Sequence, residues 1–242
     1  MEPLNELIKK AHKTLNENRN AKYEITDEVH PRNRKLRRIR ALRDIRKHGV
    51  RAGDIGGYIE SEKNLSQEGD AWVGGEALVY GDAQVFDDAS VSDEARVADE
   101  ARVAAKAKVY GEAFVADDAR VSDNARVYGE ALVADDAQVF DNARVSGEAK
   151  VYGDAKVSDN AVVTGYAWVF DNAEVSNDAQ VTAKARVYDE AKVSGKAFVF
   201  DNAEVSGEAV VAGRARVFGN AEVSGRAIID GNTKVSGDEH IS

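Results

Sequence analysis

Residues 125–154 read ARVYGE-ALVADD-AQVFDN-ARVSGE-AKVYGD, five six-residue units that begin with alanine and carry valine at the third position. The same spacing extends far to both sides. Stepping by six from Ala71, every position through Ala227 is alanine, 27 in succession, and the next position is Thr233. Stepping by six from Val73, every position through Val235 is valine except Ile229. Because no residue is inserted or deleted over this span, an internal repeat governs the fold.

Each unit follows the pattern A-x-V-z and ends in two residues that are rich in Gly, Asp and Asn. Side chains alternate between the two sides of an extended chain, so Ala and Val face one way and x and z face the other. Valine favours strands, whereas Gly, Asp and Asn accept the backbone conformations of tight turns. One unit therefore predicts four extended residues followed by a two-residue corner.

Three such sides close a triangular coil of 18 residues, and the repeats predict about nine coils. Successive coils stack as parallel strands about 4.8 Å apart. We expect an all-β solenoid, a triangular parallel β-helix with a continuous Ala and Val core that is stabilised by contacts between neighbouring coils. A period of six does not follow the 3.6 residues of an α-helical turn, and glycine is not at every third position as in collagen.

The repeat resembles the [LIV]-[GAED]-x-x-[STAV]-x hexapeptide of left-handed β-helices, with Val73 in the aliphatic site and Ala77 in the small site. The residue after valine is often Tyr, Phe or Ser, where that family has Gly or an acid. Three N-terminal stretches are similar to the N-terminal block of YdcK-type hexapeptide proteins of bacteria and phages. These stretches are KYEIT (22–26), RIRALRDI (38–45) and GDIGGYIESEKNLSQEGDAWV (53–73). The resemblance covers residues 22 to 237 and implies a left-handed coil.

The resemblance also implies an oligomer. Many hexapeptide proteins are acyl- or nucleotidyltransferases that work as trimers with the active site between subunits. The expected partner is therefore another copy of the chain, most simply in a homotrimer.

The chain divides into four expected regions. They are an amphipathic helix over residues 1–20, a cap with the first irregular coil over 21–70, the hexapeptide β-helix over 71–237 and a tail over 238–242. Helix and cap together form a small N-terminal α+β element. The helix is predicted because Leu4, Leu7 and Ile8 fall on one helical face together with Ala11 and Leu15. The C-terminal end offers no such cover, and an open coil invites further pairing, so a polymer-forming scaffold is a second alternative.

Composition limits the setting of the protein. The chain contains no cysteine and carries a net charge of −10. No apolar run approaches the roughly 20 residues that cross a bilayer, and the N-terminus lacks the pattern of a secretory signal. We expect a cytoplasmic protein, in the host cytoplasm if a phage encodes it, without a membrane partner.

Histidine placement argues against an enzyme. A hexapeptide acyltransferase needs a histidine base that titrates near neutrality. The four histidines are His12, His30, His48 and His240, and none lies between Ala71 and Gly237. We expect no catalytic residue, no bound metal and no cofactor, while a transferase with an atypical site stays an alternative.

Reading every eighteenth residue sorts the outward positions into three faces of the triangle. The first face is the richest in large apolar side chains, and contiguous apolar surface is typical of an interface. We predict that this face contacts another subunit or a partner. Its predicted interface residues are Leu78, Tyr80, Phe114, Leu132, Tyr152, Trp168, Phe170 and Tyr188. The alternative is that these residues only form ladders that stabilise stacked strands.

One corner column is acidic and makes a candidate site for a cation or a basic partner, because stacked carboxylates repel one another. It consists of Asp99, Glu100, Asp117, Asp118, Asp135 and Asp136. The alternative is a solvated edge of turn-forming residues.

The stretch from Arg32 to Arg51 contains ten Lys or Arg residues and one Asp, a local charge of +9. It is a candidate anion or nucleic-acid site. The candidate residues are Arg34, Lys35, Arg37, Arg38, Arg40 and Arg43. Apolar residues alternate with these cations, so the simpler interpretation is a cap element whose cations face the acidic first coils, and nucleic acid is not the expected partner.

Taken together, these patterns favour a non-enzymatic structural or binding protein that forms homo-oligomers. A phage-encoded protein of this kind would act on a host protein or a small ligand.

Overall fold

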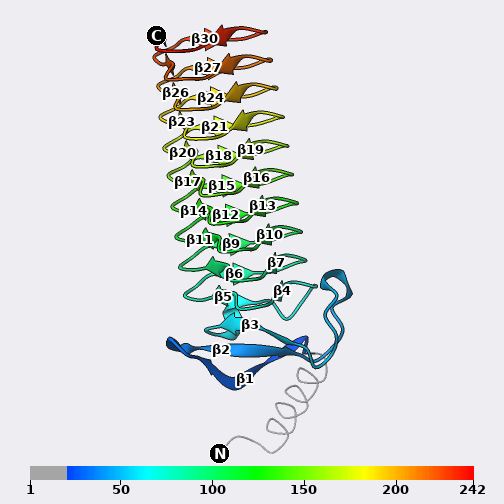
Figure 1. The fold of residues 1–242 in the computed structure, drawn as a ribbon. Helices are drawn as coiled ribbons and strands as arrows, with labels where there is room; N and C mark the ends of the chain where they lie inside the picture. The colour runs from blue at the N-terminus through cyan, green and yellow to red at the C-terminus, as the bar shows by residue number, and fades with distance from the viewer. Residues whose placement is uncertain (1–20) are drawn as a thin grey trace, which may run out of the picture.

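The protein is a straight triangular rod in a computed structural model that describes residues 21–242 (Figure 1). Three sheets, whose strands are parallel throughout the coils, form the sides of the triangle, and the outward surface of each sheet is called here the first, second or third face. The first face belongs to a 13-stranded sheet whose first three members form the cap. Its strands are β1 (Tyr23–His30), β2 (Asn33–Ala41), β3 (Ile55–Ile59), β5 (Leu78–Val79), β8 (Arg96–Val97), β11 (Phe114–Val115), β14 (Leu132–Val133), β17 (Lys150–Val151), β20 (Trp168–Val169), β23 (Arg186–Val187), β26 (Glu204–Val205), β29 (Glu222–Val223) and β32 (His240–Ile241).

The other two sheets contain only the short strands of the coils. The second face is 10-stranded and the third is 9-stranded. Second-face strands are β4 (Trp72–Val73), β7 (Ser90–Val91), β10 (Lys108–Val109), β13 (Arg126–Val127), β16 (Arg144–Val145), β19 (Val162–Val163), β22 (Gln180–Val181), β25 (Phe198–Val199), β28 (Arg216–Val217) and β31 (Lys234–Val235). Third-face strands are β6 (Gln84–Val85), β9 (Arg102–Val103), β12 (Arg120–Val121), β15 (Gln138–Val139), β18 (Lys156–Val157), β21 (Glu174–Val175), β24 (Lys192–Val193), β27 (Val210–Val211) and β30 (Ile228–Ile229).

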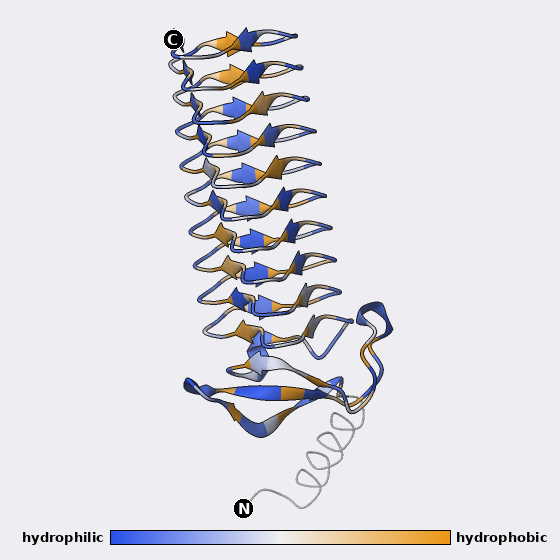
Figure 2. Cartoon of the chain, in the orientation of Figure 1, coloured by the Kyte–Doolittle hydropathy of each residue, from blue (hydrophilic) through white to orange (hydrophobic). Residues whose placement is uncertain are grey.

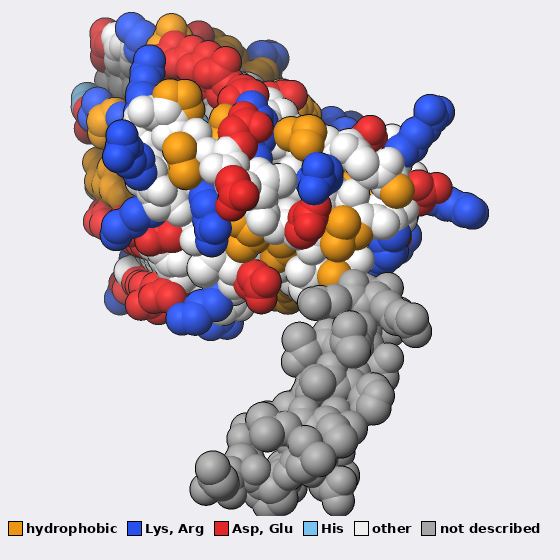
Figure 3. All heavy atoms as spheres, turned by 90° about the horizontal axis from the view of Figure 1, so that it is seen from below, with side chains coloured by type: hydrophobic (Ala, Val, Ile, Leu, Met, Phe, Trp, Pro, Cys, Tyr) orange, Lys and Arg blue, Asp and Glu red, His pale blue; other side chains and the backbone are white. Residues whose placement is uncertain are grey.

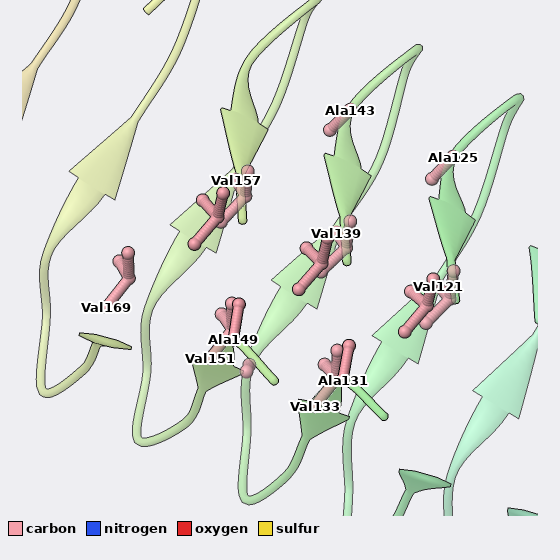
Figure 4. Close-up of a cluster of buried hydrophobic side chains, with 14 of the residues drawn as sticks. Val121, Ala125, Ala131, Val133, Val139, Ala143, Ala149, Val151, Val157 and Val169 are labelled. Carbon is pink, nitrogen blue, oxygen red and sulfur yellow. The ribbon is translucent and has the colours of Figure 1, made fainter. Parts of the chain in front are cut away.

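The register of the sheets confirms a coil of 18 residues. In neighbouring coils Phe114 pairs with Leu132 and Val115 pairs with Val133, and the same step recurs along all three sheets. Every alanine from Ala71 to Ala221 and every valine from Val73 to Val223 in the repeat is at most 1% exposed. The valine side chains lie one above another inside the rod, as Figure 4 shows for Val121, Val139 and Val157. The predicted inward and outward positions are therefore confirmed.

The corners use left-handed backbone at their first residue. Gly occupies this position in many coils, with φ of 73° at Gly129, and Asp occupies it in others, with φ of 56° at Asp135. Ala105 and Ala183 adopt the same conformation, with φ of 55° and 58°. Gly and Asp reach this conformation at lower cost than other residues, which explains their enrichment at the corners.

A β-hairpin closes the N-terminal end of the first sheet (Figure 1). Strands β1 and β2 are antiparallel, β2 is antiparallel to β3, and β3 starts the parallel stack by pairing with β5. Two short 3₁₀ helices, η1 (Arg46–His48) and η2 (Glu62–Asn64), lie in the connections. Tyr23 and Ile39 belong to the hydrophobic core and extend it beyond the first coil into the cap.

Two buried polar side chains fasten the cap to the first coil. Asn64 is fully buried, and its amide donates to the carbonyl oxygens of Gly81 at 3.0 Å and Ala83 at 2.9 Å. Its amide oxygen accepts from the backbone N–H of Ser61 at 2.8 Å. The Nζ of Lys22 donates to the carbonyl oxygen of Ala71 at 2.8 Å, and burial lowers the pKa of this ammonium group to about 8.

The two ends of the chain compare with the sequence prediction in different ways. The predicted helix over residues 1–20 lies outside the described residues, and residues 21–70 form strands and 3₁₀ turns without an α-helix. The predicted tail over 238–242 contains β32, which pairs with β29 and continues the stack. The prediction of about nine coils matches the 9-stranded sheet and is one short of the 10-stranded one. The left hand of the coil stays a prediction.

Candidate interaction surfaces

All eight predicted interface residues lie on the first face. Leu78, Phe114, Leu132 and Trp168 occupy the x position of β5, β11, β14 and β20, whereas Tyr80, Tyr152, Phe170 and Tyr188 occupy the z position just after β5, β17, β20 and β23. Each is half-buried. The prediction that these residues share one sheet is confirmed, but their arrangement has two parts. Ala98, Ala116 and Ala134 interrupt the z column between Tyr80 and Tyr152.

The C-terminal part is a compact group, called here the Trp168 cluster, that consists of Tyr152, Trp168, Phe170 and Tyr188. The Phe170 ring stacks on Tyr152 at 5.0 Å and on Tyr188 at 5.0 Å, with interplanar angles of 4° and 5°. Trp168 meets Tyr152 and Phe170 edge-on, each at 6.5 Å. Burial raises the pKa of the Tyr152 and Tyr188 hydroxyls above its usual value.

Two cations from the neighbouring coils flank the indole ring of Trp168. The Nζ of Lys150 lies 5.0 Å from its centroid, and the guanidinium of Arg186 lies 5.2 Å away. Arg186 also pairs with Glu204 at 3.2 Å. These contacts hold the ring in place and add stabilisation of the cation–π type.

A second aromatic group lies on the second face, and sequence reasoning gave it no role. The Arg216 guanidinium lies 5.9, 5.1 and 5.7 Å from the rings of Phe198, Phe200 and Phe218. Phe200 stacks on Phe218 at 4.9 Å. We call this group the Arg216 cluster. The signal for it is the same eighteen-residue step that reveals the Trp168 cluster.

Two of the six residues of the predicted acidic column, Asp117 and Asp135, have a structural role. At corners whose first residue is Asp, the carboxylate often accepts the backbone N–H of the next coil. Asp117 accepts from Asp135 at 3.3 Å, and Asp135 accepts from Gly153 at 3.0 Å. Asp87, Asp141 and Asp189 make the same contact elsewhere. The first Asp of a corner thus links two coils through a hydrogen bond.

Metal binding at this column is not supported by its geometry. No three or more His, Cys, Asp or Glu side chains are placed to hold a metal ion anywhere in residues 21–242. Contact of a basic partner with Asp99, Glu100, Asp118 and Asp136 stays a prediction.

Replacing Asp135 with alanine is expected to lower the free energy of unfolding by about 1 kcal/mol, because the hydrogen bond to Gly153 and the turn preference of Asp are both lost. Replacing its neighbour Asp136 removes a charge but no such bond. We expect Asp136→Ala to be neutral or slightly stabilising in the same denaturant titration. Equal losses in the two variants would contradict the structural role.

A longer acidic column, which sequence reasoning missed, lies between the second and first faces. Its members occupy the second corner position of five successive coils and are Glu76, Glu94, Glu112, Glu130 and Glu148. Tyr166 continues the column, and a hydrogen bond to Glu148 raises the pKa of its hydroxyl. A shallow groove of about 440 Å³ runs along Gly111, Gly129, Gly147 and Gly165 beside these carboxylates. This column can be found in the sequence by reading every eighteenth residue from Glu76.

The basic segment forms β2 and the loop after it. Arg38 pairs with Glu28 at 3.1 Å and Glu76 at 2.6 Å, and Arg43 pairs with Asp70 at 3.7 Å. Arg40 pairs with Glu24, and Lys35 lies 3.7 Å from Glu60. Seen from the cap end, basic and acidic side chains are interspersed (Figure 3). This arrangement supports the interpretation as a cap element, while anion binding at Arg34 and Arg37 stays a prediction.

The described histidines lie at the two ends of the rod. His30 meets Tyr58 edge-on at 4.9 Å, and His240 contacts Glu222 at 2.9 Å. Burial lowers the pKa of His48, whose Nε2 is buried without a hydrogen-bond partner among the described residues. His12 lies outside the described residues. No helix in the part of the chain that the structure describes is long and apolar enough to span a membrane.

Comparison with known proteins agrees with this architecture. The YdcK β-solenoid repeat family model matches residues 119–135 and 137–153, two consecutive segments in the middle of the rod. A comparison with curated proteins finds no matching relative. The 18-residue coil, the parallel sheets and the two repeat matches agree with one another, and the chain is a parallel β-solenoid whose central repeats match the YdcK β-solenoid repeat.

Proposed function

We propose that this protein is a non-enzymatic binding rod that forms homo-oligomers through the Trp168 cluster, with a trimer as the first candidate. The observation that supports this proposal is the packing of the four aromatic rings of the cluster into one half-buried patch on a flat sheet. Interfaces are enriched in aromatic residues and arginine at their centres, and such residues contribute most of the binding energy. The continuous Ala and Val core holds this patch rigid, so little ordering entropy is lost on association.

The polymer alternative is less well supported at the N-terminal end. Stacking end to end requires an open parallel coil on each partner. Strands β1 and β2 add an antiparallel hairpin to the N-terminal edge of the first sheet, so that edge does not continue the coil pattern. Lateral association through a face therefore fits the rod better.

An oligomer of this kind has grooves where two rods meet. We include in the proposal that such a groove, or a free face, binds a host protein or a small ligand, as the likeness to phage proteins implies. No contact among the described residues specifically favours the transferase alternative.

Replacing Trp168 and Phe170 together by serine is expected to convert the oligomer into a monomer of 26.1 kDa. The loss of two aromatic anchors removes apolar area and ring–ring contacts worth about 0.5–1.5 kcal/mol each beyond that area. Sedimentation equilibrium measures the mass, and circular dichroism checks that the β-helix is intact.

The matched control is the double variant Phe198→Ser and Phe200→Ser, which removes an equivalent x and z pair from the Arg216 cluster. It is expected to keep the mass of the wild type. A monomeric wild type, or a Trp168 and Phe170 variant with unchanged mass, would overturn the assignment of the first face.

A further inference from the structure

The third face contains a recess that its column of z positions creates. In four successive coils this column reads Phe86, Ala104, Ser122 and Phe140. Where aromatic residues fill successive z positions, as in Tyr110 and Tyr128 or Phe200 and Phe218, their rings stack at 4.9 Å. Two rungs of such a stack are missing between Phe86 and Phe140. The result is a cavity of about 420 Å³ with a phenyl ring at each end.

Small residues do not always open such a space. On the first face Ala98 and Ala116 also interrupt a z column, but they are buried, with exposures of only 1% and 4%. On the third face Ala104 and Ser122 are half-buried and line the cavity. The distance between the two phenyl rungs is three coils, on the order of 15 Å, so an aromatic molecule of ordinary size fits between them.

Two arginines line one side of this recess. Arg102 and Arg120 are register partners on β9 and β12, and both are exposed. The ion pairs among residues 21–242 use other arginine and lysine side chains. Gln138 continues the same column and adds an amide at the end next to Phe140. Figure 2 shows this column of third-face strands as hydrophilic up to β24 and hydrophobic at β27 and β30.

The charge around the recess sets a condition on any ligand. Three carboxylates contribute negative charge here. Glu100 and Asp118 lie two residues before Arg102 and Arg120, and Asp123 lines the recess and accepts a hydrogen bond from the Ser122 hydroxyl at 2.8 Å. They weaken the long-range attraction of an anion, which salt screens further. Binding of an anion must therefore rely on direct charge-assisted hydrogen bonds with the two arginines. The planar guanidinium group of arginine presents its N–H donors in a geometry that suits a carboxylate or phosphate group.

We propose that this recess, the third-face slot, binds a small aromatic anion. The ring system lies over Ala104 and Ser122 between Phe86 and Phe140, and its carboxylate or phosphate lies against Arg102 and Arg120. Edge-on or offset contacts with the two phenyl rings orient the ring system of the ligand. The paired guanidinium groups favour a ligand that carries a negative charge. The volume falls within the range of ordinary small-molecule sites. This site is independent of the first face and of oligomer formation.

Titration calorimetry with 2-naphthoate tests the charge requirement, with its neutral amide, 2-naphthamide, as the comparison probe. We expect saturable binding of 2-naphthoate, and binding of 2-naphthamide at least tenfold weaker. The double variant Arg102→Gln and Arg120→Gln is expected to bind 2-naphthoate at least tenfold more weakly than the wild type. The matched control, Arg126→Gln and Arg144→Gln, changes an equivalent register pair on the second face and is expected to bind like the wild type.

A second variant separates loss of the site from loss of the fold. In Ala104→Phe, a ring at this position is expected to stack on Phe86 as Tyr128 stacks on Tyr110. It occupies one of the two missing rungs and leaves too little length for a naphthalene ring, without disturbing the core. We expect this variant to keep or raise the melting temperature and to lose 2-naphthoate binding. Absence of 2-naphthoate binding to the wild type, equal binding of 2-naphthamide, or undiminished binding by Ala104→Phe would each overturn the proposal.

Discussion

Replacing Val133 with aspartate is expected to lower the free energy of unfolding by at least about 4 kcal/mol, because a buried carboxyl group is left without a partner. Val133 is fully buried in β14 and stacks between Val115 and Val151 of the adjacent coils. The neighbouring coils above and below offer only Ala and Val side chains on the inside of the rod. The aspartate must remain protonated there or push the coil open, and either response weakens the stack.

The adjacent substitution Leu132→Asp is the control, because it changes the same strand at an outward, half-buried position. We expect a loss of about 1 kcal/mol or less, arising from strand preference and lost surface contacts. Denaturant titration measures both variants, and amide exchange locates the effect, because each coil of a solenoid contacts only its neighbours. Similar losses in the two variants would contradict the assignment of inward and outward positions.

The substitution Asn64→Ala is expected to release the cap at a cost of about 3 kcal/mol. It leaves the carbonyl groups of Gly81 and Ala83 and the N–H of Ser61 without their buried partner. Amide exchange is expected to accelerate in β3 and in the first coil while β14 and β17 keep their protection.

A matched control for this variant is Asn160→Ala at an exposed corner. Asn160 donates to Asp178 at 3.0 Å and accepts from Asn142 at 3.4 Å, so it also makes amide hydrogen bonds, but in contact with solvent. Its loss is expected to cost well under 1 kcal/mol, because water replaces the missing partner. A small effect of Asn64→Ala, comparable to this control, would show that the cap is held by apolar contacts alone.

The candidate surfaces were predictable from the sequence to different degrees. The residues of the first face follow from counting by 18, because the coil length is constant, and their placement on one sheet is confirmed. Counting also puts Phe86, Phe140, Arg102 and Arg120 on the third face. Counting by 18 did not reveal the third-face slot, because the exposure of Ala104 depends on the conformations of the side chains around it. The same is true of Asp135, whose bond to the next coil depends on the shape of the corner.

The repeat by itself determined which side chains face inward, the length of the coil and the parallel stacking of the strands. Alternation along an extended chain and a turn every six residues are local properties, and the unbroken repetition then places the same residue types opposite one another every 18 positions. Only the tertiary structure decided how Asn64 and Lys22 fasten the cap, how the aromatic rings group into clusters and where the third face is hollow. Those features depend on contacts between residues 18 or more positions apart, where rotamer choice and neighbouring volume, which the residue pattern does not specify, determine the outcome.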